Sequence, residues 1–116
     1  MSTDIATRNL RIRTEEQEHT ATVNCSGRLM AGDTEVLKTH VKELLQGRNC
    51  VVLDLVELNQ LDSSGLGTIV GLYISAKRAN CDLVLIHYNK AIRELLGLTN
   101  LLSVFEDVGR SHTRLP

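Results

Sequence analysis

The stretch Leu61-Asp62-Ser63-Ser64-Gly65-Leu66-Gly67 decides the fold of this chain. It follows the apolar run Val51-Val52-Leu53-Asp54-Leu55 and precedes a segment with helical periodicity. The sequence therefore predicts a strand, a short loop and the first turn of a helix. That first turn carries about half a positive charge and presents N–H groups that have no partner within the helix. A serine hydroxyl at this place can cap the helix or carry a phosphate.

The composition fits one domain with an aliphatic core. The chain has 116 residues, of which 42% are hydrophobic but only 3% are aromatic. A net charge of −1, from 13 basic and 14 acidic residues, gives no basic surplus for binding nucleic-acid phosphates. No segment approaches the roughly 20 apolar residues that cross a membrane. We therefore expect neither nucleic acid nor a membrane as a partner.

The three cysteines, Cys25, Cys50 and Cys81, are too few and too scattered for a disulfide framework or a C-x-x-C metal site. We expect them to be small buried thiols on or beside strands. The first ten residues hold no apolar run typical of a signal peptide. Together these observations predict a cytoplasmic protein without a metal or cofactor.

The N-terminal third predicts a hairpin. Residues 1–8 are polar, and we expect a flexible N-terminal tail there. Apolar and polar residues alternate over 10–13 and 21–25, as on two half-buried strands, with a charged turn at 15–18 between them. Residues 27–32 are expected to end the hairpin and form a loop.

A helix is predicted over residues 34–46. Asp33 or Thr34 is expected to cap its beginning, and Gly47 to end it in a left-handed conformation. One apolar face recurs at helical spacing, formed by Leu37, Val41, Leu44 and Leu45.

The middle of the chain predicts a central strand and a second helix. The strand over 51–55 is apolar at nearly every position, so we expect both of its faces to be covered. Asp54, which interrupts it, is expected to bond to nearby backbone. The helix over 64–79 is expected to use Gly67 and Gly71 for close packing against the sheet, and to end at Asn80. Its apolar face is expected to comprise Leu66, Ile69, Val70, Tyr73 and Ile74.

The last third predicts a strand over 83–86 and then a short helix. Asn89 is expected to cap this helix and Gly97 to end it, with Ile92, Leu95 and Leu96 facing inward. Residues 101–105 form a last apolar stretch, interpreted as a short edge strand. Residues 109–116 are polar, and we expect a flexible C-terminal tail.

The predicted order is β-β-α-β-α-β-α, with a further strand at the end. Strands that alternate with helices need crossover connections and thus a largely parallel sheet. The fold class is therefore α/β, with an N-terminal antiparallel hairpin leading into a mixed sheet of four to five strands, flanked by three or more helices.

A nucleophilic serine is an alternative role for Ser63 or Ser64. The elbow pattern G-x-S-x-G is absent, because residues 61 and 62 are Leu and Asp. A serine without an oriented base is a weak nucleophile. The base would have to be recruited by the fold from His19, His40, His87 or His112.

Two other chemistries have weaker signals. Gly65 and Gly67 form a G-x-G, but no third glycine and no P-loop lysine follow at the required spacing. Asp54, Glu57 and Asp62 gather near one strand end without His or Cys partners at ligand spacing, which disfavours a metal site.

Helix capping accounts for only one residue of Asp62-Ser63-Ser64. It does not account for the small residues that follow, which leave backbone and hydroxyl groups accessible to another protein. We therefore interpret this surface as a docking site.

These motifs resemble the signature of STAS domains, specifically of bacterial anti-sigma factor antagonists. The resemblance spans about residues 10–105, and its specific part is the D-S-S-G-L-G at 62–67. Gly27 and Leu29 after the second strand, and Leu98 after Gly97, support it. The resemblance implies a STAS domain over 9–108 between the tails at 1–8 and 109–116.

The resemblance also implies a function without enzymatic activity. Such an antagonist, when unphosphorylated, binds an anti-sigma factor that is also a serine kinase, and so releases the sigma factor. The kinase uses ATP to phosphorylate the serine after the Asp, here Ser63, and the modified form lets go. A PP2C-like phosphatase reverses the change. The implied state of the antagonist itself is a monomer or weak dimer.

The residues expected to bind the partner come from two segments of the chain. They are Asp62, Ser63, Ser64, Gly65 and Gly67 around the phosphoacceptor, with Met30, Asp33 and Thr34 beside them. Many family members have Asp where this chain has Met30, and many end in one more helix than the short tail at 109–116 allows. The alternative function within this fold is a STAS scaffold subunit, never phosphorylated, of a signalling or lipid-transport assembly.

Overall fold

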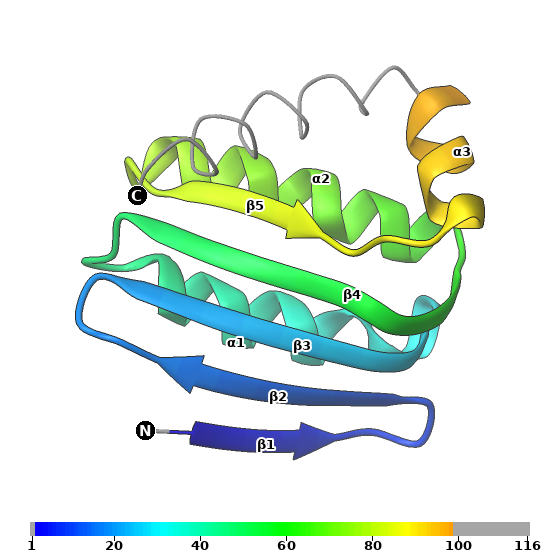
Figure 1. Ribbon diagram of the computed structural model, residues 1–116, viewed down its shortest axis with the longest axis horizontal. Helices are drawn as coiled ribbons and strands as arrows, with labels where there is room; N and C mark the ends of the chain where they lie inside the picture. Colours follow the sequence, from blue (N-terminus) through cyan, green and yellow to red (C-terminus); the bar gives the residue numbers. More distant parts are fainter. Residues whose placement is uncertain (1, 99–116) are drawn as a thin grey trace.

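A five-stranded mixed sheet organises residues 2–98, the part of the chain that the computed structural model describes (Figure 1). Its strands, in the spatial order β1-β2-β3-β4-β5, are β1 Ser2–Ala6, β2 Leu10–Glu16, β3 Thr20–Leu29, β4 Cys50–Leu61 and β5 Asp82–Ile86. The helices are the 3-10 turn η1 Ala31–Asp33, α1 Thr34–Leu45, α2 Ser63–Arg78 and α3 Lys90–Leu98.

The sheet has the mixed topology that the sequence predicts. β1, β2 and β3 are antiparallel neighbours, whereas β3, β4 and β5 run parallel and are joined through α1 and α2. Both helices lie on the same face, behind the sheet in Figure 1. The carboxyl ends of β3, β4 and β5 therefore meet at one edge, where the chain enters α1, α2 and α3.

Residues 2–6, expected within a flexible tail, form the edge strand β1 instead. Ile5 pairs with Ile12 of β2 and packs against the core, although it is only half-buried. One large apolar residue, Ile5, in a polar segment is too weak a signal for a strand. Pairing with an existing hairpin supplies the backbone hydrogen bonds that make this short strand stable.

The hairpin strands are longer than their alternating patterns indicate. The expected turn at 15–18 begins later, because residues 15 and 16 still pair with β3. The expected loop at 27–32 begins only at Met30, after β3 ends at Leu29. Gly27 has a φ of +95°, and a Cβ there would lie 2.2 Å from the carbonyl oxygen of Asn9. The strand therefore continues through a position that only glycine fits.

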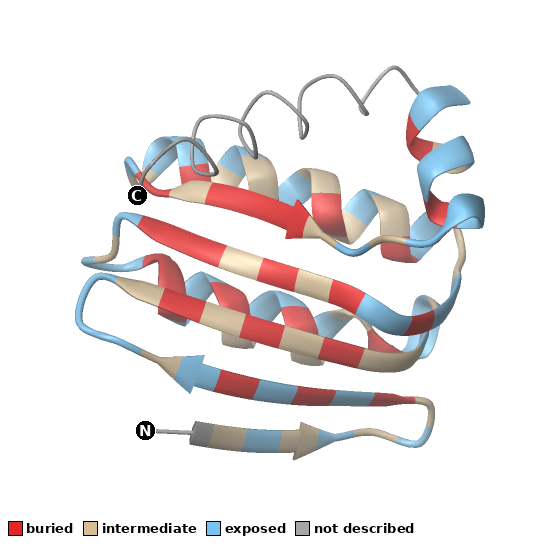
Figure 2. Cartoon of the chain, viewed as in Figure 1, coloured by how far each residue is buried: buried red, intermediate tan, exposed pale blue. Residues whose placement is uncertain are grey.

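The central strand β4 is covered unequally on its two faces. Figure 2 shows buried residues alternating with partly buried ones along it. Val51, Leu53 and Leu55 face the helices and are fully buried, whereas Val52 and Asp54 on the other face are half-buried. The expectation that both faces are covered is thus met in full on one face and only in part on the other, because α1 and α2 share one face.

Asp54 makes the predicted backbone contact. Its Oδ1 accepts a hydrogen bond from the Val56 N–H at 3.1 Å and lies 3.1 Å from Nδ1 of His87. The pairing register between β3 and β4 shifts here, between Asn24 and Ser26. Asp54 therefore satisfies a backbone donor that the irregular ladder leaves free.

Helix α1 agrees with its prediction, whereas α2 is rotated from its predicted orientation. The predicted face of α1 is buried in full, and Gly47 after it has a φ of +76°. In α2 only Ile69 of the predicted face is buried, and Ile74 is 47% exposed. The buried face consists of Gly65, Ile69, Leu72 and Ala76. The apolar pattern missed this face because small residues give the closest approach between helix and sheet.

Gly67 and Gly71 do not make the predicted close contact with the sheet. Both are exposed, and a Cβ at either would meet no atom within 4 Å. The helix does end as expected, with Asn80 following at a φ of +55°.

Asn89 caps α3 as predicted, accepting a hydrogen bond from the Ile92 N–H at 2.9 Å. Ile92 and Leu96 are buried and Leu95 is half-buried, but the helix includes Gly97 rather than ending before it. The predicted strand at 101–105 and the tail at 109–116 lie outside the described residues.

All three cysteines are free and buried, as predicted. Burial, together with the charge of Asp54, raises the pKa of the Cys25 thiol to about 12. Burial raises the pKa of Cys50 to about 11, and it also raises that of Cys81. The three side chains therefore pack as small apolar groups.

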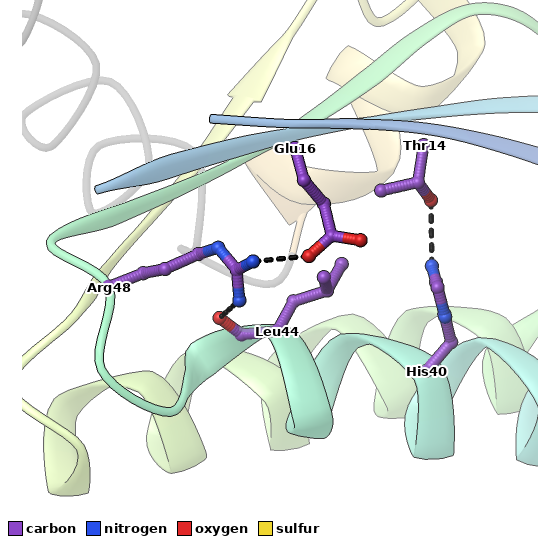
Figure 3. A network of polar contacts seen from close by, with 5 residues as sticks. All are labelled: Thr14, Glu16, His40, Leu44 and Arg48. Carbon is purple, nitrogen blue, oxygen red and sulfur yellow. Dashed lines mark hydrogen bonds and ion pairs between the residues drawn. The ribbon is translucent and has the colours of Figure 1, made fainter. Parts of the chain in front are cut away.

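A polar network fastens α1 to β2 (Figure 3). Thr14 Oγ1, which is fully buried, lies 2.7 Å from Nε2 of His40. Arg48 pairs with Glu16 and donates to the Leu44 carbonyl at 3.0 Å. Burial lowers the pKa of the His40 imidazole, against the opposing effect of Glu43 and Glu16.

The lowered pKa of His40 predicts a pH-dependent stability. The unfolded histidine, with a pKa of about 6.5, binds a proton before the folded one as the pH falls. The free energy of unfolding should therefore decrease as the pH drops through about 6.5 towards the folded pKa. Urea unfolding between neutral and mildly acidic pH measures this slope. The slope should be shallower in His40→Gln, which keeps a hydrogen-bonding group near Thr14, than in the control variant His19→Gln, whose side chain is exposed. Equal slopes in all three proteins would contradict the assignment.

Candidate functional site

The candidate site lies where β3 and β4 end, at the edge of the sheet from which α1 and α2 begin. The β3–α1 connection passes this edge through Met30, and the β4–α2 connection consists of Asp62 alone. The Asp62 N–H points to the Leu29 carbonyl at 3.4 Å, which continues the pairing of the two strands by one residue. The strand register therefore sets the distance between the two connections.

The carboxylate of Asp62 joins these two connections. Its Oδ1 accepts a hydrogen bond from the Gly65 N–H at 2.8 Å, so Asp62 caps α2. Its Oδ2 accepts from the Ala31 N–H at 3.1 Å, across a separation of 31 residues. One side chain thus satisfies a free donor of the helix and fixes the neighbouring loop beside it.

Gly65 allows the first turn of α2 to pack against the end of β3. A Cβ at this position would lie 2.4 Å from the Leu29 carbonyl oxygen and 2.6 Å from Cδ1 of Leu61. A side chain therefore has no room unless backbone moves. Gly65 is a packing residue, buried beneath the surface that the serines form.

Ser63 and Ser64 occupy the first two helical positions, and both are exposed. Because Asp62 is the cap, neither hydroxyl is needed for that role. Among residues 2–98 neither hydroxyl has a hydrogen-bond partner, and the N–H groups of these two residues have no acceptor. Two hydroxyls and two N–H donors are therefore open at the positive end of α2.

The structure brings most of the predicted partner-binding residues together at the surface, but Gly65 and Asp33 are buried. Met30 is half-buried and lies next to Ala31, which Asp62 holds, and Thr34 is half-buried at the beginning of α1. Asp33 is only 3% exposed, so it cannot line a docking face. Asp33 stands at the N-cap position of α1, but no side chain makes the capping hydrogen bond that is predicted from Asp33 or Thr34.

Asp33 instead fastens the β1–β2 turn. Its Oδ1 accepts a hydrogen bond from Thr7 Oγ1 at 2.7 Å, and Thr7 Oγ1 also accepts from the Leu10 N–H at 3.1 Å. The other oxygen, Oδ2, is buried without a protein partner among the described residues. Asp33 therefore stabilises the scaffold beside the site.

The histidines that could serve as a catalytic base, and the side chains that could bind a metal ion, do not lie around Ser63 and Ser64. His19 pairs with Glu18, His40 lies against Thr14 and His87 against Asp54, while His112 lies outside the described residues. Within 2–98 no group of three or more His, Cys, Asp or Glu side chains is placed to hold a metal ion. No helix in the same range is long and apolar enough to cross a membrane.

Three groups that build the site were not predicted. The Leu29 carbonyl, the Ala31 N–H and the Thr7 hydroxyl act through hydrogen bonds between segments far apart in the chain. A single sequence carries no signal for such pairs. The one local signal is Gly65, because a glycine inside a helix can indicate that another part of the chain lies close to it.

A model of the STAS domain matches residues 11–114. A curated relative, the anti-sigma F factor antagonist of Paenibacillus polymyxa, is 30% identical over 98 residues, which cover 83% of this chain and 84% of the relative.

Solved structures share the fold. An anti-sigma factor antagonist from Mycobacterium paratuberculosis superposes with a TM-score of 0.73 at 19% identity, over 91% of this chain and 96% of that one. The antagonist SpoIIAA in its unphosphorylated form superposes with a TM-score of 0.71 at 16% identity, over 79% of this chain and 83% of that one.

The contrast between Gly65 and Gly67 gives a matched test of packing. Gly65→Ala forces a methyl group against backbone, so it should lower the free energy of unfolding by about 1–3 kcal/mol. Gly67→Ala meets open space in a helix interior, so it should raise it by about 0.5–1 kcal/mol. Urea unfolding of the two variants measures both effects. Destabilisation of similar size in both would contradict the close approach at Gly65.

The two hydrogen bonds of Asp62 can be separated by amide hydrogen exchange. Asp62→Ala removes both acceptors, so exchange should accelerate at Gly65 and Ala31, with a loss of about 0.5–2 kcal/mol in stability. Asp62→Asn keeps one acceptor oxygen, so only one of the two amides should lose its protection. Unchanged exchange at Ala31 in Asp62→Ala would show that its N–H does not depend on this carboxylate.

Proposed function

The chain belongs to the STAS domain family, and we propose that it acts as an anti-sigma factor antagonist that phosphorylation of Ser63 switches off. The antagonists of this family are regulatory binding proteins without enzymatic activity. In the proposed cycle the unphosphorylated chain binds an anti-sigma factor with serine kinase activity and so releases the sigma factor. The kinase supplies the phosphoryl group from ATP, and a PP2C-like phosphatase removes it.

The observation that carries the proposal is the open hydroxyl of Ser63 directly beside the capping Asp62. Ser63 is exposed, and its hydroxyl has no partner within 2–98, so a kinase can reach it without unfolding the helix. Its position at the start of α2 is one where a phosphoryl group is tolerated, because the helix N-terminus favours negative charge. Phosphorylation should therefore leave the domain folded.

The same charge should weaken the complex with the partner. A phosphoryl group adds about −1.5 to −2 charges next to the carboxylate of Asp62. That carboxylate is held by Gly65 and Ala31, so it cannot turn away without losing both hydrogen bonds. A partner surface that accommodates Ser63 would then face concentrated negative charge, which costs several kcal/mol when it is buried without a counter-ion.

The proposed docking face combines the phosphoacceptor with the loop that Asp62 holds. It consists of Met30, Ala31, Thr34, Asp62, Ser63, Ser64 and Gly67. Met30 supplies an apolar side chain where many family members have Asp, so this position is proposed to adjust partner choice. Gly65 contributes by packing from below, and Asp33 by supporting the loop.

The proposal is tested first by phosphorylation in vitro. The chain is incubated with ATP and the candidate anti-sigma kinase, its intact mass is measured, and any phosphate is mapped by peptide fragmentation. One added phosphate on Ser63 is the expected result. No phosphate despite tight binding to the kinase would refute the switch and favour a constitutive antagonist. Phosphate on Ser64 alone would refute the assignment of the site.

Variants of the two serines separate modification from binding. Ser63→Ala should bind the anti-sigma kinase as tightly as wild type and persist in the complex when ATP is added. Ser63→Asp should bind at least about tenfold more weakly, a difference of about 1.4 kcal/mol. Ser64→Ala is the matched control and should still be phosphorylated. Isothermal titration calorimetry with each variant provides the affinities, and equal values for all of them would count against the proposal.

A further inference from the structure

A groove lies between the C-terminal ends of α1 and α2. Because both helices begin at the edge of the sheet that carries Ser63, they end together at the opposite edge (Figure 1). At about 1.5 Å per helical residue, Arg78 at the end of α2 lies roughly 22 Å from Ser63. The groove is therefore separate from the proposed docking face. Six residues line it: Lys42, Leu45 and Gln46 of α1, and Ser75, Arg78 and Ala79 of α2.

The groove combines buried apolar residues with an exposed cationic rim. Leu45 is buried and Ala79 is half-buried, whereas Lys42 and Arg78 are exposed. Within residues 2–98 the charged groups of Lys42 and Arg78 have no ion pair or hydrogen bond. The Ser75 hydroxyl has no partner in that part of the chain either. The donors along the groove are therefore open to groups from outside the domain.

The charge around the groove is positive. Lys38, which is exposed one turn before Lys42 on α1, adds a third cation, and two like charges at this spacing repel each other. Helix α2 contains no acidic residue. The two acids of α1 lie elsewhere, because Glu35 is in its first turn and Glu43 acts on His40, on the side that faces β2. The two helix C-termini offset only part of this charge, since each carries about half a negative charge.

We propose that this groove docks an acidic amphipathic helix of a second protein. The groove between two packed helices receives one row of side chains from a third helix, so apolar residues of the partner would cover Leu45 and Ala79. Acidic side chains on either side of that row would meet Lys42 on α1 and the guanidinium fork of Arg78 on α2. Charge complementarity thus favours an acidic partner and disfavours a basic one.

The surface of α2 beside the groove supports this arrangement. Ile74 lies one turn before Arg78 on the same face of the helix and is 47% exposed. It therefore extends the apolar contact that the partner helix can make. Since Ser63 lies at the other end of α2, a partner bound here would leave that serine accessible. One protein would thus hold the domain while another modifies it.

A titration followed by nuclear magnetic resonance tests the groove with a defined probe. The isotope-labelled chain receives an alanine-based helical peptide of about 16 residues that carries a row of leucines flanked by glutamates. At about 20 mM salt the amides of Lys42, Gln46, Ser75 and Arg78 should shift most, and the shifts should diminish at about 500 mM salt. A peptide with glutamine in place of each glutamate should bind at least about tenfold more weakly.

Charge reversal in the chain locates the contact. Lys42→Glu and Arg78→Glu should each weaken peptide binding at least about tenfold, and Lys42→Gln and Arg78→Gln should weaken it less. Lys77→Glu is the matched control, because Lys77 is the sequence neighbour of Arg78 but lies over the Tyr73 ring. It changes the net charge by the same amount and should cost less than about threefold in affinity. Circular dichroism verifies folding, and the glutamine variants provide the test where a glutamate variant does not fold.

Several outcomes would overturn the proposal. They are the absence of shifts at millimolar peptide, shifts centred on Ser63 or spread evenly over the surface, and equal binding of the glutamine peptide or of the charge-reversed variants. The same shifts on concentrating the chain alone would assign the groove to a second copy instead. The same shifts with free glutamate, at matched carboxylate concentration, would show binding of simple anions only. None of these measurements involves the kinase, so they stand apart from the test of Ser63.

Discussion

The carboxylate of Asp62 is the interaction on which the site depends. It accepts from the Gly65 N–H in α2 and from the Ala31 N–H in the β3–α1 loop, two segments that the chain separates widely. The cap therefore also determines where the neighbouring loop lies relative to the helix. Since Asp62 performs this work, the adjacent serines remain free for chemistry that involves another protein.

The surrounding strands hold that carboxylate in place. The long strand β4 runs the full length of the sheet and ends directly at Asp62, and its pairing with β3 continues to Leu29 and Leu61. Gly65 then lets the first turn of α2 lie against the end of β3. The position where α2 begins is therefore fixed by three features: the register of β3 and β4, the absence of a side chain at Gly65 and the hydrogen-bonded carboxylate of Asp62. Gly67 and Gly71 add no packing contacts, so the outer surface of α2 carries no side chain at these two positions.

The sequence predicts what depends on local pattern and misses what depends on pairs distant in the chain. The strand–loop–helix unit around Ser63, the cap at Asn89 and the mixed sheet could be predicted, because periodicity and capping chemistry are local. The apolar pattern predicts the wrong face of α2, because a count of large apolar residues ignores Gly65 and Ala76, two of the residues that the helix buries. Asp33 looked like a capping residue, and only the fold reveals its bond to Thr7.

The three buried cysteines have a consequence for what kinds of signal the domain can receive. The thiolate is the form that oxidants and electrophiles attack, and burial suppresses it at Cys25, Cys50 and Cys81. Peroxide or electrophile stress should therefore leave the folded domain chemically unaltered at these positions. Under the proposed function the domain is then regulated by modification of one group, the hydroxyl of Ser63. The same inertness makes the chain a convenient host for a fluorescent label, since a cysteine introduced on the surface would react while the native ones stay silent.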